Sequence, residues 1–599
     1  MMLSKLYSNK PAQFKAVSFV TGLNVVLAEI RLPANRNRDT HNLGKSTLGR
    51  LLDFAFLGGK DNKKVFLFKH LDRFEDFVFY LELSLRDGSY ITVRRSVAEA
   101  TKIAFKRHAG RHQDFSDLPE QGWDHFNVPI EKAREILDGM LDWRGVKPWR
   151  YRKGLGYLLR SQDDYHSVFQ LGKFASKHGD WKPFLGHVLG FDSAVIDLHY
   201  KKALELEEKQ VTEQNINSEL GGTIEDISKV EGLLLLKQKE AQKRQKLLDD
   251  FDFRAQDKDK TKQVVDQIDE RIAILNAERY SLAQNRKKIL ASLDDDKILF
   301  NPDDAERLFR EAGILFQGQI KKDFEQLIDF NKAITDERRT YLTEERDEIE
   351  ADLKKINAEL SSLGKKRSEA LSFLSSTDVF AKYKHTSDEM VVLRADITSL
   401  ERQRVFLRRL QELRAEIRAI KEELQKLQSQ IEADVEKQNS DATSLFSVIR
   451  LYFSEIVEDV IDRKALLSVA PNQYGHLEFK AEILDESGNA TSADMGHTYR
   501  KLLCIAFDLA VLRAHANDSF PRFVYHDGVF ESLDDRKKEN LLVVIRNYAA
   551  LGLQPIITLI DSDLPVRPEG SDPVFDESEI VLVLHDEGEQ GRLFTMKAW

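Results

Sequence analysis

The chain has 599 residues, a formal net charge of −10 and a charged fraction of 32%, whereas about 25% is usual for a globular domain. Its 13 prolines, 30 glycines and single cysteine exclude Pro-rich, collagen-like and disulfide-scaffold proteins and favour long solvated helices. The first residues lack the apolar segment of a signal peptide, and no run approaches the roughly 18 apolar residues of a membrane span. We therefore expect a cytoplasmic protein without a membrane partner.

Residues 1–197 are predicted to be mixed α/β and to contain a phosphate-binding loop. An apolar strand predicted at 23–27 leads to Gly44-Lys45-Ser46-Thr47 and then to a helix predicted over 48–54. In such a loop, backbone N–H groups and the lysine hold phosphates, and the hydroxyl group holds Mg²⁺. A chance match at a helix start is the alternative. The residues that we expect to contact nucleotide are Asn42, Gly44, Lys45, Ser46, Thr47 and, from the segment before the loop, Arg38.

Residues 198–437 are predicted to be helical and strongly charged. Apolar residues recur at alternating spacings of three and four over 265–293, 349–363 and 410–431. This spacing places a narrow apolar seam on one helix face, which is buried only against another helix. We predict an outgoing coiled-coil arm over 198–295, a hairpin tip over 296–330 and a returning arm over 331–437. Ordinary amphipathic helices in a bundle are the alternative.

Each predicted arm contains one interruption, at Phe251–Lys260 and at Phe373–Glu389. The interruptions lie at similar distances from the tip, so an antiparallel hairpin would bring them together as one elbow. Two basic groups near the head are candidate DNA contacts, with ordinary solvated surfaces as the alternative. One is the segment 144–153, which also holds Trp149 and Tyr151. The other is on the returning arm and comprises Arg402, Arg404, Arg408, Arg409, Arg414 and Arg418.

Residues 438–599 are predicted to return to mixed α/β structure and to carry a second nucleotide motif. An apolar strand predicted at 523–527 ends in Asp527, as in a Walker B motif, whose carboxylate holds Mg²⁺ directly or through water. Ser532, Leu533 and Asp534 then form a D-loop before a helix predicted over 535–548 and a strand over 554–560. A strand ending in aspartate is common by itself, but together with the phosphate-binding loop it completes a divided nucleotide site.

Two half-heads separated by a coiled-coil hairpin, with Walker A in the first and Walker B in the second, resemble the SMC, RecN and zinc-hook repair ATPases of the ABC class. The resemblance implies an α/β ABC-ATPase head, a split P-loop NTPase, interrupted by a long antiparallel α-helical coiled-coil hairpin. The tip has no Cys-x-x-Cys pair, which excludes a zinc hook. The segments 526–538 and 557–563 resemble more narrowly the SMC-like ATPases of bacterial anti-phage systems of the Lamassu and ABC-three-component type.

The resemblance also implies ATP and Mg²⁺ as cofactors and a homodimer formed through ATP-bound heads. It implies a Q-loop glutamine, for which Gln162 is the candidate, so that Ser46, Gln162 and Asp527 would hold Mg²⁺. A plain surface glutamine is the alternative. Finally, it implies a signature segment that contacts the γ-phosphate bound to the opposite subunit. The candidates lie before a helix predicted over 501–514 and are Ser492, Asp494, Gly496 and His497.

Two departures from the family pattern affect catalysis. Gly528 stands where the family has its catalytic glutamate, so Glu531 is the only nearby candidate base. The histidine expected after the last core strand is also missing, and Asp561 stands near that position. With Asp527, Glu531 and Gln162 as the catalytic residues, we expect slow or conditional hydrolysis and intact ATP binding.

The sequence thus predicts an SMC-like ATPase that couples its nucleotide state to DNA sensing in anti-phage or anti-plasmid defence. The resemblance implies the defence setting and a separate effector, such as a nuclease, as partner, and nothing in this chain itself resembles a nuclease site. Two alternatives remain open. One is a RecN-like DNA repair ATPase. The other is a non-catalytic scaffold that uses nucleotide only as a switch, an alternative that is supported by Gly528 in place of the catalytic glutamate.

Overall fold

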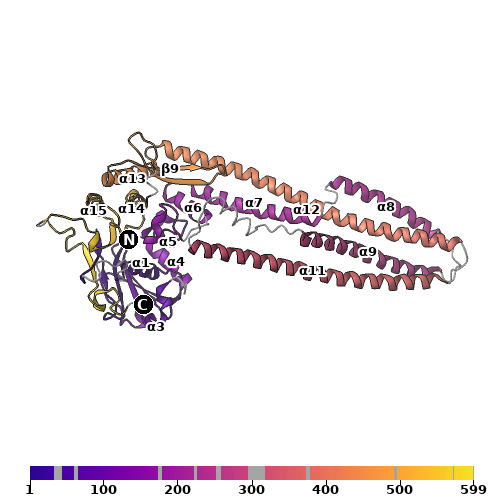
Figure 1. Cartoon of the computed structure of the whole chain (residues 1–599), viewed down its shortest axis with the longest axis horizontal. Coiled ribbons are helices and arrows are strands. Elements are labelled where there is room, and N and C mark those ends of the chain that lie inside the picture. Colours follow the sequence, from indigo (N-terminus) through magenta and orange to yellow (C-terminus); the bar gives the residue numbers. More distant parts are fainter. Residues whose placement is uncertain are drawn as a thin grey trace. The chain divides into compact units, whose positions relative to one another are not determined.

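The computed structural model describes residues 1–32, 43–59, 65–172, 178–220, 226–250, 258–294, 318–372, 378–491, 496–568, 570 and 572–597. These residues form two compact units. One unit, called the head here, combines Met1–Leu204 with Glu422–Trp599, and the other, called the arm, is Glu205–Lys421 (Figure 1). Both unit boundaries fall inside long helices and therefore differ from the predicted limits at residues 197 and 438.

The head contains three sheets. A six-stranded antiparallel sheet has the order β2-β1-β4-β5-β6-β7 and consists of β1 (Met2–Ser8), β2 (Val17–Ser18), β4 (Val78–Ser84), β5 (Tyr90–Ser96), β6 (Lys102–His108) and β7 (His125–Pro129). A five-stranded parallel sheet has the order β13-β3-β12-β11-β8 and consists of β3 (Asn24–Glu29), β8 (Leu159–Arg160), β11 (Phe523–Asp527), β12 (Gln554–Ile560) and β13 (Ile580–His585). The third sheet pairs β9 (Ala465–Pro471) with β10 (Leu477–Ile483).

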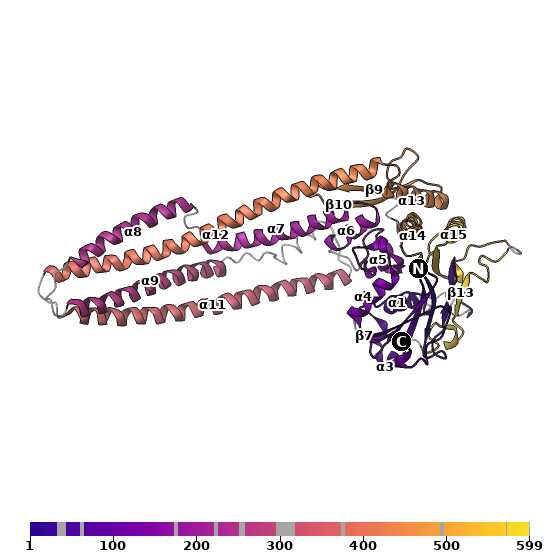
Figure 2. The same ribbon diagram turned by 180° about the vertical axis from the view of Figure 1, so that it is seen from behind.

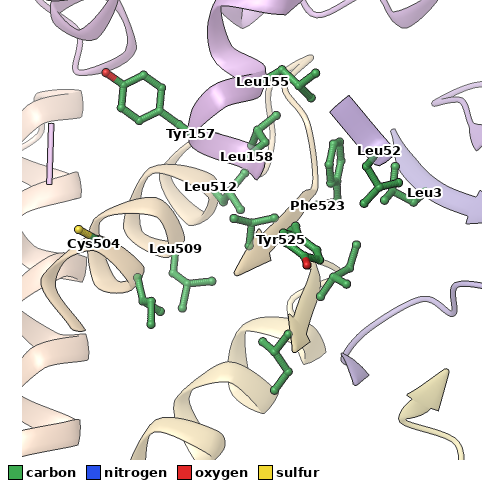
Figure 3. Close-up of a cluster of buried hydrophobic side chains, with 14 of the residues drawn as sticks. Leu3, Leu52, Leu155, Tyr157, Leu158, Cys504, Leu509, Leu512, Phe523 and Tyr525 are labelled. Atoms are coloured by element: carbon green, nitrogen blue, oxygen red, sulfur yellow. The ribbon is translucent and has the colours of Figure 1, made fainter. Parts of the chain in front are cut away.

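The helices of the head come from both ends of the chain. They are α1 (Lys45–Ala55), α2 (Phe66–Lys69), α3 (Leu71–Phe74), α4 (Ile130–Leu141), α5 (Tyr151–Leu158), α6 (His178–Val188), α13 (Leu445–Ile461), α14 (His497–Ala514) and α15 (Asp535–Ala550). Figure 3 shows their shared core, in which Leu52 and Leu158 from the first half pack near Leu512, Phe523 and Tyr525 from the second. The two halves therefore fold as one hydrophobic unit.

The parallel sheet brings the predicted motifs to one edge. Every residue of β11 is buried, and every residue of β3 and β12 except the last is buried as well. Such burial is typical of parallel strands covered on both faces. All neighbouring strands in this sheet run parallel. The loops that follow β3, β8, β11 and β12 consequently lie at the same carboxyl edge, where ligands bind in open α/β sheets.

The arm is made of long helices whose limits differ in part from the prediction. They are α7 (Ser193–Leu220), α8 (Ile227–Asp249), α9 (Lys258–Asp294), α11 (Gly318–Ser372) and α12 (Asp378–Ser440). The returning helix begins at Gly318 rather than at residue 331, and the predicted interruption at 373–389 is helical from Asp378 onward. A break before α8 was missed, although the sequence holds the helix breakers Gly221 and Gly222 there. Asp226 caps α8 by accepting the Ser228 N–H at 2.9 Å.

Helices of the arm pair in antiparallel fashion. Ion pairs join Lys209 to Glu416 at 2.6 Å, Arg408 to Glu231 at 2.8 Å and Arg271 to Glu359 at 2.9 Å. α12 therefore pairs with α7 and α8, while α9 pairs with α11 (Figure 1). Between these charges runs the predicted apolar seam, with Leu410, Leu413 and Ile417 buried against Ile216.

The arm is folded at the predicted elbow. Five side chains from all four helices that meet there form one buried cluster, consisting of Leu248, Val265, Leu371, Tyr383 and Met390. Beside them Arg367 of α11 forms an ion pair with Asp269 of α9 at 2.6 Å and donates to Ser387 of α12 at 2.6 Å. Farther along, residues 278–282 of α9 and 352–356 of α11 share a cavity with Arg402 of α12. The α9–α11 pair thus lies alongside α12 (Figure 2).

Replacing Arg367 with Met should open the elbow, because it leaves the nearly buried Asp269 carboxylate without its cation. Spin labels attached through Ser281→Cys and Arg402→Cys give the distance between α9 and α12 by electron spin resonance. The native Cys504 is buried and should not be labelled. We expect one short distance in the parent and a longer population in Arg367→Met. Arg346→Met is the control, because Arg346 pairs with Asp347 within α11 itself. Equal distance distributions for both variants would contradict this account.

Candidate nucleotide site

The predicted phosphate-binding loop ends at the N-terminus of α1. Gly44 is the N-cap, with φ 107° and no side-chain cap, and a Cβ there would lie 2.6 Å from the Leu593 Cβ. Only glycine suits both the left-handed conformation and this close approach. Lys45, Ser46 and Thr47 form the first turn of α1 and are half-buried, so N–H groups of a helix start face the loop. Arg38 and Asn42 lie outside the described residues.

The Lys45 ammonium group is surrounded by carboxylates. Burial lowers the pKa of Lys45 below its ordinary value, although Asp527, Glu531 and Asp563 raise it in part. All three carboxylates therefore lie within electrostatic range of the lysine at the carboxyl edge of the sheet. Arg31, near the start of the loop, is instead engaged by Glu29 at 2.6 Å and by Glu587 at 3.0 Å.

Asp527 ends β11 and is fully buried. Its Oδ1 accepts a hydrogen bond from Thr558 Oγ1 of the neighbouring strand, whereas its Oδ2 has no hydrogen-bond partner among the described residues. A buried carboxylate oxygen without a partner is costly and needs an explanation such as a bound cation. This oxygen and the hydroxyl of Ser46 provide the oxygen ligands that Mg²⁺ prefers.

Glu531 occupies the space beside Gly528. Gly528 has φ 68°, and a Cβ there would lie 2.5 Å from Glu531 Oε1 and 2.9 Å from Gln162 Nε2. The Glu531 carboxylate thus sits where a side chain at position 528 would begin. Gln162, exposed at the start of a 3₁₀ turn after β8, donates to Glu531 Oε1 at 2.7 Å. The two predicted residues are therefore in direct contact.

Two further residues of this site were missed by the sequence analysis. Lys501 of α14 is 2% exposed and donates to the Gly528 carbonyl and to Glu531 Oε2, both at 2.9 Å. A lysine inside a helix carries no sequence signal for such a role. Asp563 is the second, since burial and the Glu531 carboxylate raise its pKa above the ordinary value.

Asp561 was expected near the site, but its carboxylate accepts the Ile30 N–H at 3.0 Å and so fixes the end of β3. Asp563, at the other end of the 3₁₀ turn Asp561–Asp563, is one of the carboxylates that raise the pKa of Lys45.

A buried charged network lies beneath the site. Arg160 donates to both oxygens of Asp508 at 2.8 Å, and His526 Nε2 lies 3.0 Å from Asp508 Oδ2. Burial lowers the pKa of Arg160, but Asp508 together with Cys504 and Tyr165 raises it, and the net result is above the ordinary value. The network joins β8, α14 and β11. Its Arg160 lies two residues before Gln162, and its His526 lies one residue before Asp527.

Only part of the predicted signature falls within the described residues, because Ser492 and Asp494 lie outside them. α14 begins at His497, four residues earlier than predicted, with Gly496 as an N-cap that makes no side-chain cap hydrogen bond. The D-loop follows β11. Within it Ser532 has φ 66°, and Asp534 caps α15 by accepting the Lys537 N–H at 3.1 Å.

The basic segment 144–153 is mostly neutralised in the structure. Arg144, Lys147, Arg150 and Arg152 each form an ion pair with a nearby aspartate or glutamate. On the arm, Arg408 and Arg414 pair with glutamates of α8 and α7. Within the described chain, Arg404, Arg409 and Arg418 form no ion pair. Of these, Arg404 and Arg418 lie on the same side of α12, which makes these two the stronger candidates for phosphate contacts.

Comparison with known proteins gives a partial match. Residues 456–598 match a family described as "Uncharacterised protein conserved in bacteria (DUF2326)". No curated protein matches the chain. No helix among the described residues is long and apolar enough to cross a membrane, and these residues contain no cluster of three metal-ligating His, Cys, Asp or Glu side chains.

Several solved Smc heads are similar to the chain. One, with a coiled coil and joint, comes from Pyrococcus yayanosii (15% identity, TM-score 0.36, covering 93% of this chain and 92% of that chain). A second, from Pyrococcus furiosus, has an extended coiled coil bound to the C-terminal domain of ScpA (12%, 0.30, 94% and 92%). A third is bound to the C-winged helix domain of ScpA (11%, 0.33, 94% and 91%). Because identities and TM-scores are low, the site's own geometry has to carry the functional argument.

Replacing Asp508 with Asn should destabilise the head by about 3–5 kcal/mol, because Arg160 then loses its buried counter-charge. Denaturation followed by tryptophan fluorescence reports on the head, since all five tryptophans lie outside the arm. Asp87→Asn is the control. It breaks an ion pair with Arg107 whose side chains are about half exposed, and it should cost at most about 1 kcal/mol. Similar losses for the two variants would contradict a special role for the network.

Proposed function

We propose that this chain is an SMC-like ATPase of the ABC class that acts in the bacterial cytoplasm. It binds and hydrolyses ATP, dimerises through its heads, and couples its nucleotide state to DNA binding. The observation that supports this most is the convergence of Lys45, Asp527 and Glu531, with Gln162 hydrogen-bonded to Glu531. Three separate segments of sequence supply these residues, and all three lie at the carboxyl edge of one parallel sheet.

Nucleotide binding follows from the start of α1. Backbone N–H groups at a helix N-terminus and the positive end of its dipole favour a phosphate. The Lys45 ammonium group adds a charge that is poised among carboxylates and is therefore available to a bound phosphate chain. Ser46 and the unpartnered oxygen of Asp527 would hold Mg²⁺, which when bound supplies positive charge that offsets the phosphates.

Hydrolysis needs a base beside the attacking water. Glu531 takes this role in place of the residue at 528: it accepts a proton while the water oxygen attacks the γ-phosphorus and ADP leaves. Gln162 contacts the same carboxylate and can orient the water. Both carboxylate oxygens already accept hydrogen bonds, from Gln162 and Lys501. The direction of the carboxylate toward a water therefore depends on Gln162 and Lys501, in line with slow or conditional turnover.

Dimerisation would place the N-terminus of α14 against the partner's nucleotide. Gly496 leaves the N–H groups of an 18-residue helix without a side-chain cap, so an anion is favoured there. The signature residues Ser492, Asp494, Gly496 and His497 would serve this contact, and the D-loop at Ser532–Asp534 lies between β11 and α15.

The biological setting follows the narrower resemblance. Defence against phage or plasmids with a separate effector is the favoured role, and a RecN-like repair ATPase is the second candidate. An effector gene beside this one would favour defence. A non-catalytic scaffold is the third candidate, and it requires that ATP binds without turnover.

Glu531→Gln should lower ATP turnover at least about 100-fold, because the base is lost, while an ATP analogue still binds. Gly528→Ala should lower turnover as well, since its Cβ meets the Glu531 carboxylate at 2.5 Å and φ is unfavourable. Lys45→Ala should abolish binding itself.

Glu539→Gln is the control for these assays, since Glu539 pairs with Arg567 at 2.6 Å, outside the site. Unchanged turnover in Glu531→Gln would exclude Glu531 as the base, and binding without any turnover in the parent protein would favour the scaffold.

DNA contact is expected on one side of α12. Arg404, Arg408 and Arg418 recur at helical spacing, whereas Arg402 and Arg409 lie on another side of the helix. The charge reversal Arg404→Glu/Arg418→Glu should weaken DNA binding. It should also reduce the slope of log affinity against log salt concentration by the equivalent of about two phosphate contacts. Arg402→Glu/Arg409→Glu changes the charge equally and is the control. Equal losses of affinity in both double variants, measured by fluorescence anisotropy, would argue against a defined DNA face.

A further inference from the structure

Lys501 is buried in the head with its ammonium group directed at the turn after β11. Its Nζ donates to the Gly528 carbonyl and to Glu531 Oε2, and it lies 5.2 Å from the centre of the Tyr165 ring. A buried ammonium group is stable only when it is paired and hydrogen-bonded. Both hydrogen bonds of Lys501 go to the four-residue segment Gly528–Glu531, so this lysine binds that one loop.

The backbone of the loop is held by hydrogen bonds, among them Gly528 N–H to the Thr558 carbonyl at 3.1 Å, and the Glu531 side chain is oriented by contacts of its own. Gly528 and Ser532 on either side of it have positive φ values of 68° and 66°, and the segment between them belongs to no helix or strand. The carboxylate is instead held from two sides. Gln162 contacts one oxygen from the exposed 3₁₀ turn, and Lys501 contacts the other from the buried face of α14.

We propose that Lys501 is a positioning residue for ATP hydrolysis, which aims the Glu531 carboxylate and ties it to α14. This inference rests on the proposed ATPase function. Lys501 lies one helical turn beyond His497, at the end of α14 that would face the partner's nucleotide. A shift of α14 on dimerisation therefore moves the anchor of the base, and turnover depends on an event at the N-terminus of that helix.

The inference separates two roles that a buried lysine can have. A purely structural lysine would affect the stability of the head, whereas a positioning lysine acts on turnover through Glu531. Lys182 provides a matched control, because it is also buried, at 9% exposure, but lies on α6 beside Trp181 and away from the site.

The test compares Lys501→Met with Lys182→Met in the full-length protein. Turnover, KM for ATP, affinity for a non-hydrolysable ATP analogue and the unfolding midpoint are measured for each. We expect Lys501→Met to lower kcat about 10- to 100-fold, as for a misplaced catalytic group, with KM and analogue affinity within about twofold of the parent. Lys182→Met should leave kcat unchanged. Lys501→Arg, which keeps the cation, should recover part of the lost turnover. If Lys501→Met does not fold, Lys501→Gln serves in the same comparison.

A double variant decides whether Lys501 acts through Glu531. In the Glu531→Gln background, Lys501→Met should cause no further loss of turnover. Three results would each overturn the inference. They are a double variant whose loss of turnover is the product of the two single losses, a Lys182→Met variant whose kcat falls as much as that of Lys501→Met, and a Lys501→Met variant whose analogue affinity falls as much as its kcat. A parent protein that binds the analogue but never hydrolyses ATP would instead contradict the proposed ATPase function. The two failures are therefore distinguishable.

Discussion

The buried contact of Arg160 with Asp508 and His526 is the constraint on which the head depends. The first pair joins residues 348 positions apart in the sequence, so it closes the two ends of the chain into one unit. Arg160 also donates to the carbonyls of Asp164, Ser167 and Val168 and thereby shapes the turn that presents Gln162. Charges buried in this way are costly unless every one is paired, so β8, α14 and β11 cannot shift independently. Gln162, which follows β8, and Asp527, which ends β11, are therefore held in fixed positions.

Glu531, the proposed base, shows how a residue from another position in the sequence can occupy the same place in space. A glutamate directly after Asp527 would extend from position 528, whereas here Gly528 leaves that space open and Glu531 fills it from three residues later. The exchange needs a loop with two residues at positive φ and two anchoring side chains, Gln162 and Lys501. The same anchors restrict the carboxylate, which is the structural basis for the proposal that hydrolysis is conditional rather than fast.

The sequence predicted the large features because they follow from periodic patterns. The heptads indicated the arm and its antiparallel pairing, and the apolar strands ending at Asp527 and before Gly44 indicated the divided sheet. It could not predict Lys501 or Asp508, because a charged residue on a core helix is recognisable only by its partner across the fold. The environments of two nearby aspartates were unpredictable for a similar reason: the Asp561 carboxylate accepts the Ile30 N–H, whereas the Asp563 carboxylate acts electrostatically on Lys45. The end of α7 at Leu220 could have been predicted, because Gly221 and Gly222 follow it in the sequence.

The central claim is that Glu531 stands in for the glutamate absent at position 528. A structure of the E531Q variant with ATP and Mg²⁺ tests it most directly. The account predicts that the side chain at position 531 and Gln162 both contact one water in line with the γ-phosphate, with Lys501 still bound to the Gly528 carbonyl. A side chain at 531 that points away from the γ-phosphate, with another group on the attacking water, would contradict it.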